Sequence, residues 1–339
     1  MIENIRHFAY NGDGWELSLR QRFDPAKLKK DRRPVAIVPG YGMNSRIFGY
    51  HPHGLSLEEY FADKGFEVWA MDMRCQGDSR YVGKPLGRCQ KGPGHSLKEL
   101  ATIDLRTALD YIAANTLSTE GSGNVDCVGC SLAGIIICAY FVLCPSARIG
   151  SFIALGAPVR WTEIPPFMRI AFGSPFIIGH IPFKKSREIA GVLLPLVKYV
   201  PKLANIYIHG SHTDLSCAKE FAKTVEDPLP RINREIAVWV KTRDLFIDGV
   251  NISEGMKKFT NPLLCVVANA DGIVPAGTAS SLLDLVGSRT RDVISVGNDE
   301  LQFAHADLYV SNHACDMHFS PVATWLENQY SKPEAGNQG

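Results

Sequence analysis

The chain has 339 residues, of which 45% are hydrophobic and 21% charged, with 36 basic and 35 acidic side chains. This composition is typical of a folded globular protein with one large core or two domains, and it excludes intrinsic disorder. A formal charge of +1 provides no general drive toward nucleic acid, so we expect no nucleic-acid partner.

The first residues, the apolar runs and the cysteines of the chain indicate where in the cell the protein is expected. Residues 1–7 lack the basic segment, apolar run and cleavage site of a secretory signal. The longest nearly unbroken apolar run, residues 132–144, is too short to cross a bilayer. Nine cysteines, several of them inside apolar runs, favour reduced core residues. We therefore expect a cytoplasmic protein.

Short apolar runs alternate with helical patterns along most of the chain. An alternating run at 14–22, behind a turn at 11–14, predicts an N-terminal hairpin. Further strands are expected at 35–38, 66–71, 125–128, 151–155, 263–268 and 292–296, and helices at 55–64 and 97–115. Strands separated by helices favour an α/β fold with a mostly parallel central sheet and helices on both faces.

Residues 159–258 break this alternation. They contain fifteen basic and ten acidic residues, and the excess of positive charge lies in 159–213. An apolar and basic insertion between late sheet strands predicts a largely helical cap over the sheet edge, although a subdomain beside the core would have the same bounds. We expect an α/β core in two parts, 1–158 and 259–339, with the cap at 159–258 between them.

A strand-to-helix turn carries the strongest chemical signal. The strand expected at 125–128 runs into Gly129-Cys130-Ser131-Leu132-Ala133-Gly134, and an apolar helical pattern follows. This pattern is a variant of the nucleophile elbow, in which small neighbours let strand and helix approach closely. It predicts Ser131 as a nucleophile and directs the Leu132 N–H at a developing oxyanion. A serine at such a turn can also simply cap the helix.

An acidic residue and a histidine follow in the order that this type of sheet favours. Asp271 lies just past the strand expected at 263–268, and His305 lies further along, ahead of a C-terminal helical pattern. In a Ser–His–Asp relay, His305 takes and returns the proton of Ser131, while Asp271 fixes the imidazole tautomer. An Asx turn is the alternative for Asp271, and Asp307 is a rival acid.

The loop after the first central strand supplies a fourth feature. The strand expected at 35–38 ends in Pro39-Gly40-Tyr41-Gly42, in the place of the loop that donates a second N–H to the oxyanion. We therefore expect the backbone N–H groups of Tyr41 and Leu132 to form the oxyanion hole.

With these motifs, the chain resembles the α/β-hydrolase superfamily over nearly its full length. The supporting residues are the Pro39-Gly40-Tyr41-Gly42 loop, the three catalytic motifs and the segment 65–80. That segment is similar to acid lipases and to polyhydroxyalkanoate synthases and their lipase-like relatives, which implies acyl-ester or acyl-thioester substrates. Pro39 replaces the histidine of many relatives. The synthases carry cysteine where this chain has Ser131, which favours hydrolysis over polymerisation.

Other polar motifs carry weaker signals. Cys127 and Cys130 have C-x-x-C spacing, but no second pair follows at zinc spacing. The His- and Cys-containing segment 313–318 is expected to form a solvated polar face, and His51 and His53 to lie at the pocket entrance or on the surface. We expect no metal and no cofactor.

Two further aspartates are expected to be structural. Asp104, in the helix expected at 97–115, is predicted to be a buried hydrogen-bonding residue, and Asp126 to pair with a neighbouring loop.

These features predict a serine hydrolase that cleaves small-molecule or lipid-like carboxylic acyl esters through an acyl-enzyme. An acyltransferase or thioesterase is the alternative, because water and other acceptors compete for the same acyl-enzyme. A non-catalytic binding protein is disfavoured because all three relay positions are present.

The stretch 164–183 is rich in large apolar residues, and Lys184, Lys185 and Arg187 follow it. If these apolar residues line the pocket mouth, they predict medium or long acyl chains. The basic cluster then predicts a docking place for an anionic headgroup or carboxylate, or contact of the cap with an anionic membrane surface. Simple packing of the stretch on the core is the alternative.

Overall fold

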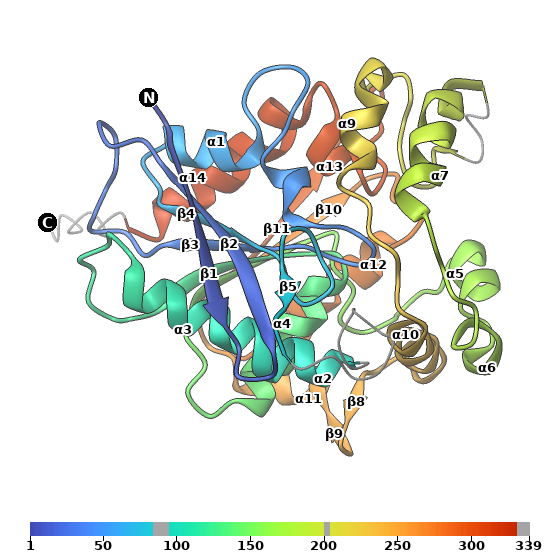
Figure 1. Ribbon diagram of the computed structural model, residues 1–339, viewed down its shortest axis with the longest axis horizontal. Coiled ribbons are helices and arrows are strands. Elements are labelled where there is room, and N and C mark those ends of the chain that lie inside the picture. Colours follow the sequence, from blue (N-terminus) through green and yellow to red (C-terminus); the bar gives the residue numbers. More distant parts are fainter. Residues whose placement is uncertain (84–94, 200–203, 331–339) are drawn as a thin grey trace, which may run out of the picture.

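A central nine-stranded sheet organises the molecule (Figure 1), in a computed structural model that describes residues 1–83, 95–199 and 204–330. Its strands are β1 (Glu3–Tyr10), β2 (Trp15–Phe23), β3 (Val35–Val38), β4 (Val68–Met71), β5 (Arg80–Tyr81), β6 (Val125–Cys130), β7 (Ile149–Leu155), β10 (Leu263–Ala268) and β11 (Arg291–Val296). The order is β1-β2-β4-β3-β6-β7-β10-β11, with β5 paired to β2.

The direction of the strands confirms the predicted fold class. β1 and β2 form the expected antiparallel hairpin, which joins β4 in antiparallel orientation. From β4 through β3, β6, β7 and β10 to β11 every pairing is parallel. Parallel strands bring their carboxyl ends to one edge of the sheet, and the loops at that edge carry the residues discussed below.

Helices cover both faces of the sheet, and each face has its own apolar cluster. Figure 1 shows α3 and α4 on one side of the sheet and α1 and α14 on the other. The helical elements outside the segment between β7 and β10 are η1 (Ser45–Phe48), α1 (Leu57–Asp63), α2 (Leu97–Glu99), η2 (Leu100–Leu105), α3 (Arg106–Asn115), α4 (Leu132–Leu143), α12 (Ala276–Ala279), η6 (Ser281–Asp284), α13 (Asp307–Val310), η7 (Cys315–Phe319) and α14 (Ser320–Asn328). The helix expected at 97–115 is one continuous run with a π-helical middle, η2.

The chain between β7 and β10 forms a mostly helical insertion. Its elements are α5 (Pro166–Ala171), α6 (Pro175–Ile178), α7 (Ser186–Leu193), η3 (Leu194–Tyr199), η4 (Leu215–Cys217), α9 (Ala218–Ala222), α10 (Pro230–Thr242), β8 (Phe246–Ile247), β9 (Val250–Asn251), α11 (Ile252–Gly255) and η5 (Met256–Lys258). Residues 200–203 of the expected cap lie outside the described residues. In α10, Ile232, Ile236, Trp239 and Val240 share one buried stripe, as helical periodicity requires.

Within the described residues, no group of three or more His, Cys, Asp or Glu side chains is arranged so that it could hold a metal ion. His318 corrects the prediction of a solvated face at 313–318: it is fully buried, and burial lowers the pKa of its imidazole to about 4. His51 is also buried, with Nε2 3.0 Å from the Ser311 carbonyl oxygen. None of the eight cysteines in the described part of the chain forms a disulfide. No helix in that part is long and apolar enough to cross a membrane.

Asp104 is the buried hydrogen-bonding residue that the sequence predicts. Its carboxylate accepts from Arg74 at the backbone N (3.0 Å), Nε (2.8 Å) and Nη2 (2.7 Å), and from Asn11 Nδ2 (2.7 Å). Asp126 likewise accepts from Arg33 Nε and Ser151 Oγ, both at 2.9 Å. Asp104 thus joins η2 to the segments of Asn11 and Arg74, and Asp126 joins β6 to β7 and to the chain before β3.

We expect Asp104→Ala to lower the free energy of unfolding by about 3–5 kcal/mol, because the Arg74 guanidinium loses its buried partner. Urea unfolding measures this change. Asp63→Ala is the control, since Asp63 pairs with Lys27 on the surface and its removal is expected to cost less than about 1 kcal/mol. Equal losses in the two variants would contradict the central role of the buried pair.

Candidate active site

Ser131 sits in an unusual backbone conformation between β6 and α4. Its φ of 51° and ψ of −121° lie in a region that L-residues rarely adopt. The turn is sterically tight, because a Cβ at Gly134 would lie 2.4 Å from the Ala157 Cβ. The Ser131 side chain makes no helix-capping hydrogen bond. Its hydroxyl is therefore directed away from the helix backbone, unlike that of a simple N-cap serine.

The structure brings Ser131, His305 and Asp271 together in one hydrogen-bonded chain. His305 Nε2 lies 3.0 Å from Ser131 Oγ, and His305 Nδ1 lies 2.6 Å from Asp271 Oδ2. All three side chains are almost completely buried, so the two hydrogen bonds lie in surroundings of low dielectric constant. Because Asp271 accepts at Nδ1, the neutral imidazole carries its proton there and presents a lone pair to the serine hydroxyl.

Asp271 is fixed by the loop that follows β10. Its Oδ1 accepts from the backbone N–H groups of Ile273 and Val274, each at 2.8 Å. The Asx turn weighed above is therefore present, and it holds the carboxylate that faces His305. Asn269 joins this loop to the histidine loop, because its Oδ1 accepts from Phe303 N (2.8 Å) and Ala270 N donates to Phe303 O. Asn269 is not among the residues predicted from the sequence, although its position directly after an expected strand is a signal for such a role.

Asp307 has a different task from Asp271. Its carboxylate accepts from Ala304 N (2.8 Å), His209 N (3.1 Å) and Thr213 Oγ1 (3.3 Å). These bonds fasten the turn that carries His305 to the insertion. Asp307 is thus a buried structural carboxylate, and the rival role weighed for it has no support in the geometry.

The loop after β3 approaches the Ser131 turn closely. A Cβ at Gly40 would lie 2.6 Å from Cys130 O and 2.9 Å from Ser131 Cβ, so only glycine allows this approach. In the described residues, the backbone N–H groups of Tyr41 and Leu132 donate no hydrogen bond. Leu132 is also the first residue of α4, where the helix dipole favours negative charge.

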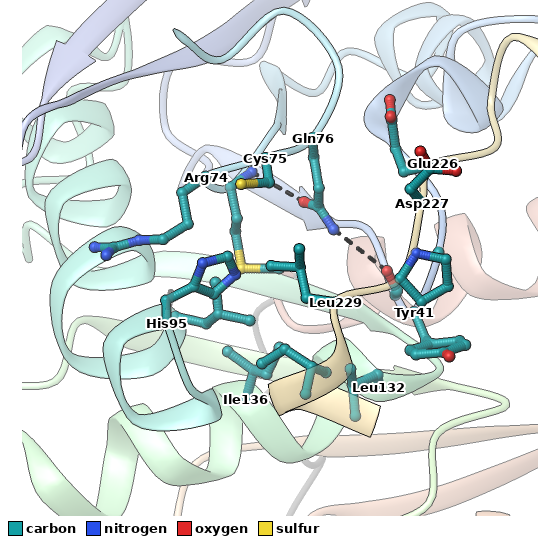
Figure 2. A pocket seen from close by; sticks show the side chains of 16 residues that line it. Tyr41, Arg74, Cys75, Gln76, His95, Leu132, Ile136, Glu226, Asp227 and Leu229 are labelled. Atoms are coloured by element: carbon teal, nitrogen blue, oxygen red, sulfur yellow. Dashed lines mark hydrogen bonds between the residues drawn. The ribbon is translucent and has the colours of Figure 1, made fainter. Parts of the chain in front are cut away.

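Contacts on two sides hold this loop. The Tyr41 hydroxyl donates to Asn233 Oδ1 on α10 (2.6 Å), and its ring meets Phe172 edge to face. Figure 2 shows the opposite side, where Gln76 Nε2 donates to Gly40 O (3.4 Å) and Gln76 Oε1 accepts from Met73 N (3.0 Å). The cavity there has a volume of only about 50 Å³, too small for an organic substrate.

The insertion also bonds to the loop directly. Met43 and Val225 form an antiparallel bridge, and Glu226 N donates to Gly42 O at 2.8 Å. The Glu226 carboxylate accepts from Asn44 Nδ2 (2.6 Å), from Gly77 N (3.0 Å) and from Arg187 Nη2 (2.9 Å). Residues 224–226 thus hold the loop that carries Tyr41.

A cavity of about 600 Å³ opens beside Ser131 and His305. Its walls are mainly apolar and come largely from the insertion. Of the nine large apolar residues of 167–183, five line it: Phe167, Met168, Phe172, Ile178 and Phe183. The other four, Ile170, Phe176, Ile177 and Ile181, are exposed on the surface. The stretch is therefore divided between the cavity and solvent, and simple packing on the core does not describe it.

Cys130, next to Ser131, is not poised as a nucleophile. Its thiol is fully buried and donates to the Tyr309 hydroxyl at 2.7 Å. Burial raises the pKa of this thiol to about 12, so the thiolate is scarce near neutral pH.

The comparisons with known proteins identify the family. The Alpha/beta hydrolase family matches residues 35–275, which span β3 to the loop that carries Asp271. The chain belongs to the α/β hydrolase family. A search of curated protein sequences finds no significant match.

Solved structures with the same fold are distant in sequence. An esterase from Exiguobacterium antarcticum superposes with a TM-score of 0.60 at 14% identity, covering 95% of this chain and 100% of that one. A meta-cleavage product hydrolase from Pseudomonas fluorescens superposes with a TM-score of 0.59 at 15% identity, covering 96% of this chain and 98% of that one. A bromoperoxidase from Bacillus anthracis superposes with a TM-score of 0.59 at 14% identity, covering 96% of this chain and 100% of that one. At these identities the likeness shows the fold alone.

We expect neutral His305 to carry its proton on Nδ1, because Asp271 accepts there. ¹⁵N NMR of the labelled imidazole measures this tautomer. Asp271→Asn should weaken the preference for Nδ1–H, whereas Asp307→Asn should retain it and lower the stability instead. An Nε2–H tautomer in the wild-type protein would contradict the hydrogen-bonded chain described above.

Proposed function

We propose that the protein is a serine hydrolase that cleaves carboxylic acyl esters through an acyl-enzyme. The observation that carries this proposal is the hydrogen-bonded chain Ser131–His305–Asp271 at the wall of an apolar cavity. A strained serine at a strand–helix turn, a histidine at its hydroxyl and a buried carboxylate behind the histidine provide a nucleophile, a base and an orienting acid.

In the proposed reaction, Ser131 Oγ attacks the ester carbonyl carbon while His305 Nε2 takes the hydroxyl proton. Asp271 keeps the other imidazole proton on Nδ1 and stabilises the cation that forms. Collapse of the tetrahedral intermediate breaks the bond to the alcohol oxygen, which leaves with the proton from His305. Water then attacks the acyl-enzyme by the same route, releasing the acid and restoring Ser131.

The negative charge of the tetrahedral intermediate needs fixed donors. We assign this role to the backbone N–H groups of Tyr41 and Leu132, which are unused within the described residues and lie on the two segments that meet at Gly40. The bonds from Tyr41 to Asn233 and from Gly42 to Glu226 keep this loop in place before substrate arrives.

Several observations support an acyl-ester substrate in particular. The segment 65–80 resembles acid lipases and lipase-like relatives of polyhydroxyalkanoate synthases, and the solved neighbours include esterases. We propose that the insertion, bounded at 159–258, acts as a cap that shapes the acyl pocket.

We also propose a cytoplasmic location for the protein. The cysteines of the described residues support it, because none of them forms a disulfide.

Ser131→Ala is expected to fold normally and to lose ester hydrolysis by about three to six orders of magnitude, because only oxyanion stabilisation and binding remain. Hydrolysis of p-nitrophenyl esters measures the loss, and circular dichroism checks the fold. A fluorophosphonate should label Ser131. Labelling at Cys130 would contradict the assignment of Ser131 as the nucleophile.

The cavity walls predict a preference for medium or long acyl chains over acetyl, since each buried methylene contributes about 0.8 kcal/mol, or roughly fourfold. The kcat/KM values for C2 to C12 esters measure it. Met168→Ala should flatten the rise with chain length, whereas Ile170→Ala should not, because Ile170 lies on the same helix but faces solvent. A steep optimum at C2 would refute the acyl pocket.

Transfer to an acceptor other than water is the competing outcome. Ester hydrolysis repeated with added alcohol or thiol separates the two cases. If acylated acceptor replaces free acid as the main product at low acceptor concentration, the protein is an acyltransferase. The roles of Ser131, His305 and Asp271 would be unchanged.

A further inference from the structure

The outer layer of the insertion exposes an unusual amount of apolar surface. Of the 23 large hydrophobic side chains that are exposed in the described residues, 11 lie between residues 167 and 199. We call the exposed apolar side chains of residues 167–196 the apolar face. Its most exposed members include Ile170 (85%), Phe176 (74%) and Val192 (69%). Soluble surfaces seldom gather such residues without a partner.

The apolar face lies on short helices that pack from one side only. Figure 1 places α5, α6 and α7 along one edge of the molecule, with α6 against α10 and α7 against α9. Not one residue of α7 is buried, although it carries Ile189, Val192 and Leu193. These helices therefore present their apolar side chains outward.

The apolar face is continuous with the mouth of the cavity beside Ser131. Phe167 and Phe183 line the cavity and are also exposed, by 43% and 39%. A surface that covers the apolar face would therefore meet the opening through which an acyl chain enters.

The charge around the apolar face selects among possible occupants. Residues 167–196 contain four basic side chains and one acidic side chain. Lys184 and Lys185 are exposed and form no ion pair within the described residues. A second copy of the chain would bring two such faces of equal sign together, whereas anionic headgroups complement them.

We propose that the apolar face docks reversibly on an anionic lipid surface, with Lys184 and Lys185 at the headgroups and the cavity mouth toward the acyl chains. Shallow insertion of apolar side chains beside basic residues is sufficient for peripheral binding and needs no spanning helix. Docking itself does not rest on the proposed ester hydrolysis.

Flotation with phosphatidylcholine vesicles, with and without phosphatidylglycerol, tests the docking. The Ser131→Ala protein is used, so that binding is read independently of activity. We expect Phe176→Ser/Ile177→Ser to weaken binding to phosphatidylglycerol vesicles by about tenfold or more. The matched control Phe246→Ser/Val250→Ser removes two exposed apolar residues from the β8–β9 hairpin and should leave binding within about twofold.

A second pair of variants tests the charge. Lys184→Gln/Lys185→Gln should remove most of the preference for phosphatidylglycerol, whereas Lys29→Gln/Lys30→Gln, an exposed pair outside the insertion, should not. Absence of vesicle binding, or equal losses in the variants and their controls, would overturn the proposal. So would concentration-dependent self-association that Phe176→Ser/Ile177→Ser abolishes, because a second copy would then cover the apolar face. Hydrolysis of a soluble ester by the same variants in the Ser131 background checks that the site remains intact.

Discussion

The backbone of Ser131 is the constraint on which the rest of the site depends. A positive φ at a residue with a side chain is unfavourable by about 1–3 kcal/mol, so it persists only where the surrounding structure fixes it. Here β6 is held between β3 and β7, and α4 starts at once with buried apolar residues. The small residues Gly40, Gly134 and Ala157 allow neighbouring segments to close around the turn. The strain is thus balanced by the packing of the sheet itself.

The partners of Ser131 come from loops that the sheet alone would not fix. Asn269 joins the loop of Asp271 to the loop of His305, and Asp307 joins the latter to the insertion. On the opposite side, Glu226 and Asn233 bond to the loop that carries Tyr41. The loop of Asp271 is held as well, because Gly272 N donates to Ile206 O of the insertion at 3.1 Å. The insertion therefore does more than enclose a cavity, because its hydrogen bonds hold all three loops around Ser131 in position.

Much of the fold was predictable because short, continuous apolar runs mark strands that are buried on both faces, as at Val35–Val38 and Leu263–Ala268. The residues brought to Ser131 were predictable for a related reason: parallel strands end at one edge, and Asp271 and His305 follow such ends. The role of Asp307 and the burial of His318 depend on contacts between segments far apart in the sequence, which spacing does not encode. The apolar stretch 164–183 shows the same limit. Its composition does not predict that Met168 lines the cavity whereas Ile170, two residues later, is exposed to solvent.

The burial of the thiols has a consequence for chemical durability. Cys130 is adjacent to Ser131 in sequence, yet burial raises the pKa of its thiol to about 12, so the reactive thiolate is scarce near neutral pH. Cys127, Cys138 and Cys265 are equally enclosed, and burial raises the pKa of each. Among the cysteines of the described residues, we therefore expect peroxides and alkylating agents to reach the partly exposed Cys75, Cys217 and Cys315 first. Burial thus shields the thiol next to Ser131 from oxidants in the surrounding solution.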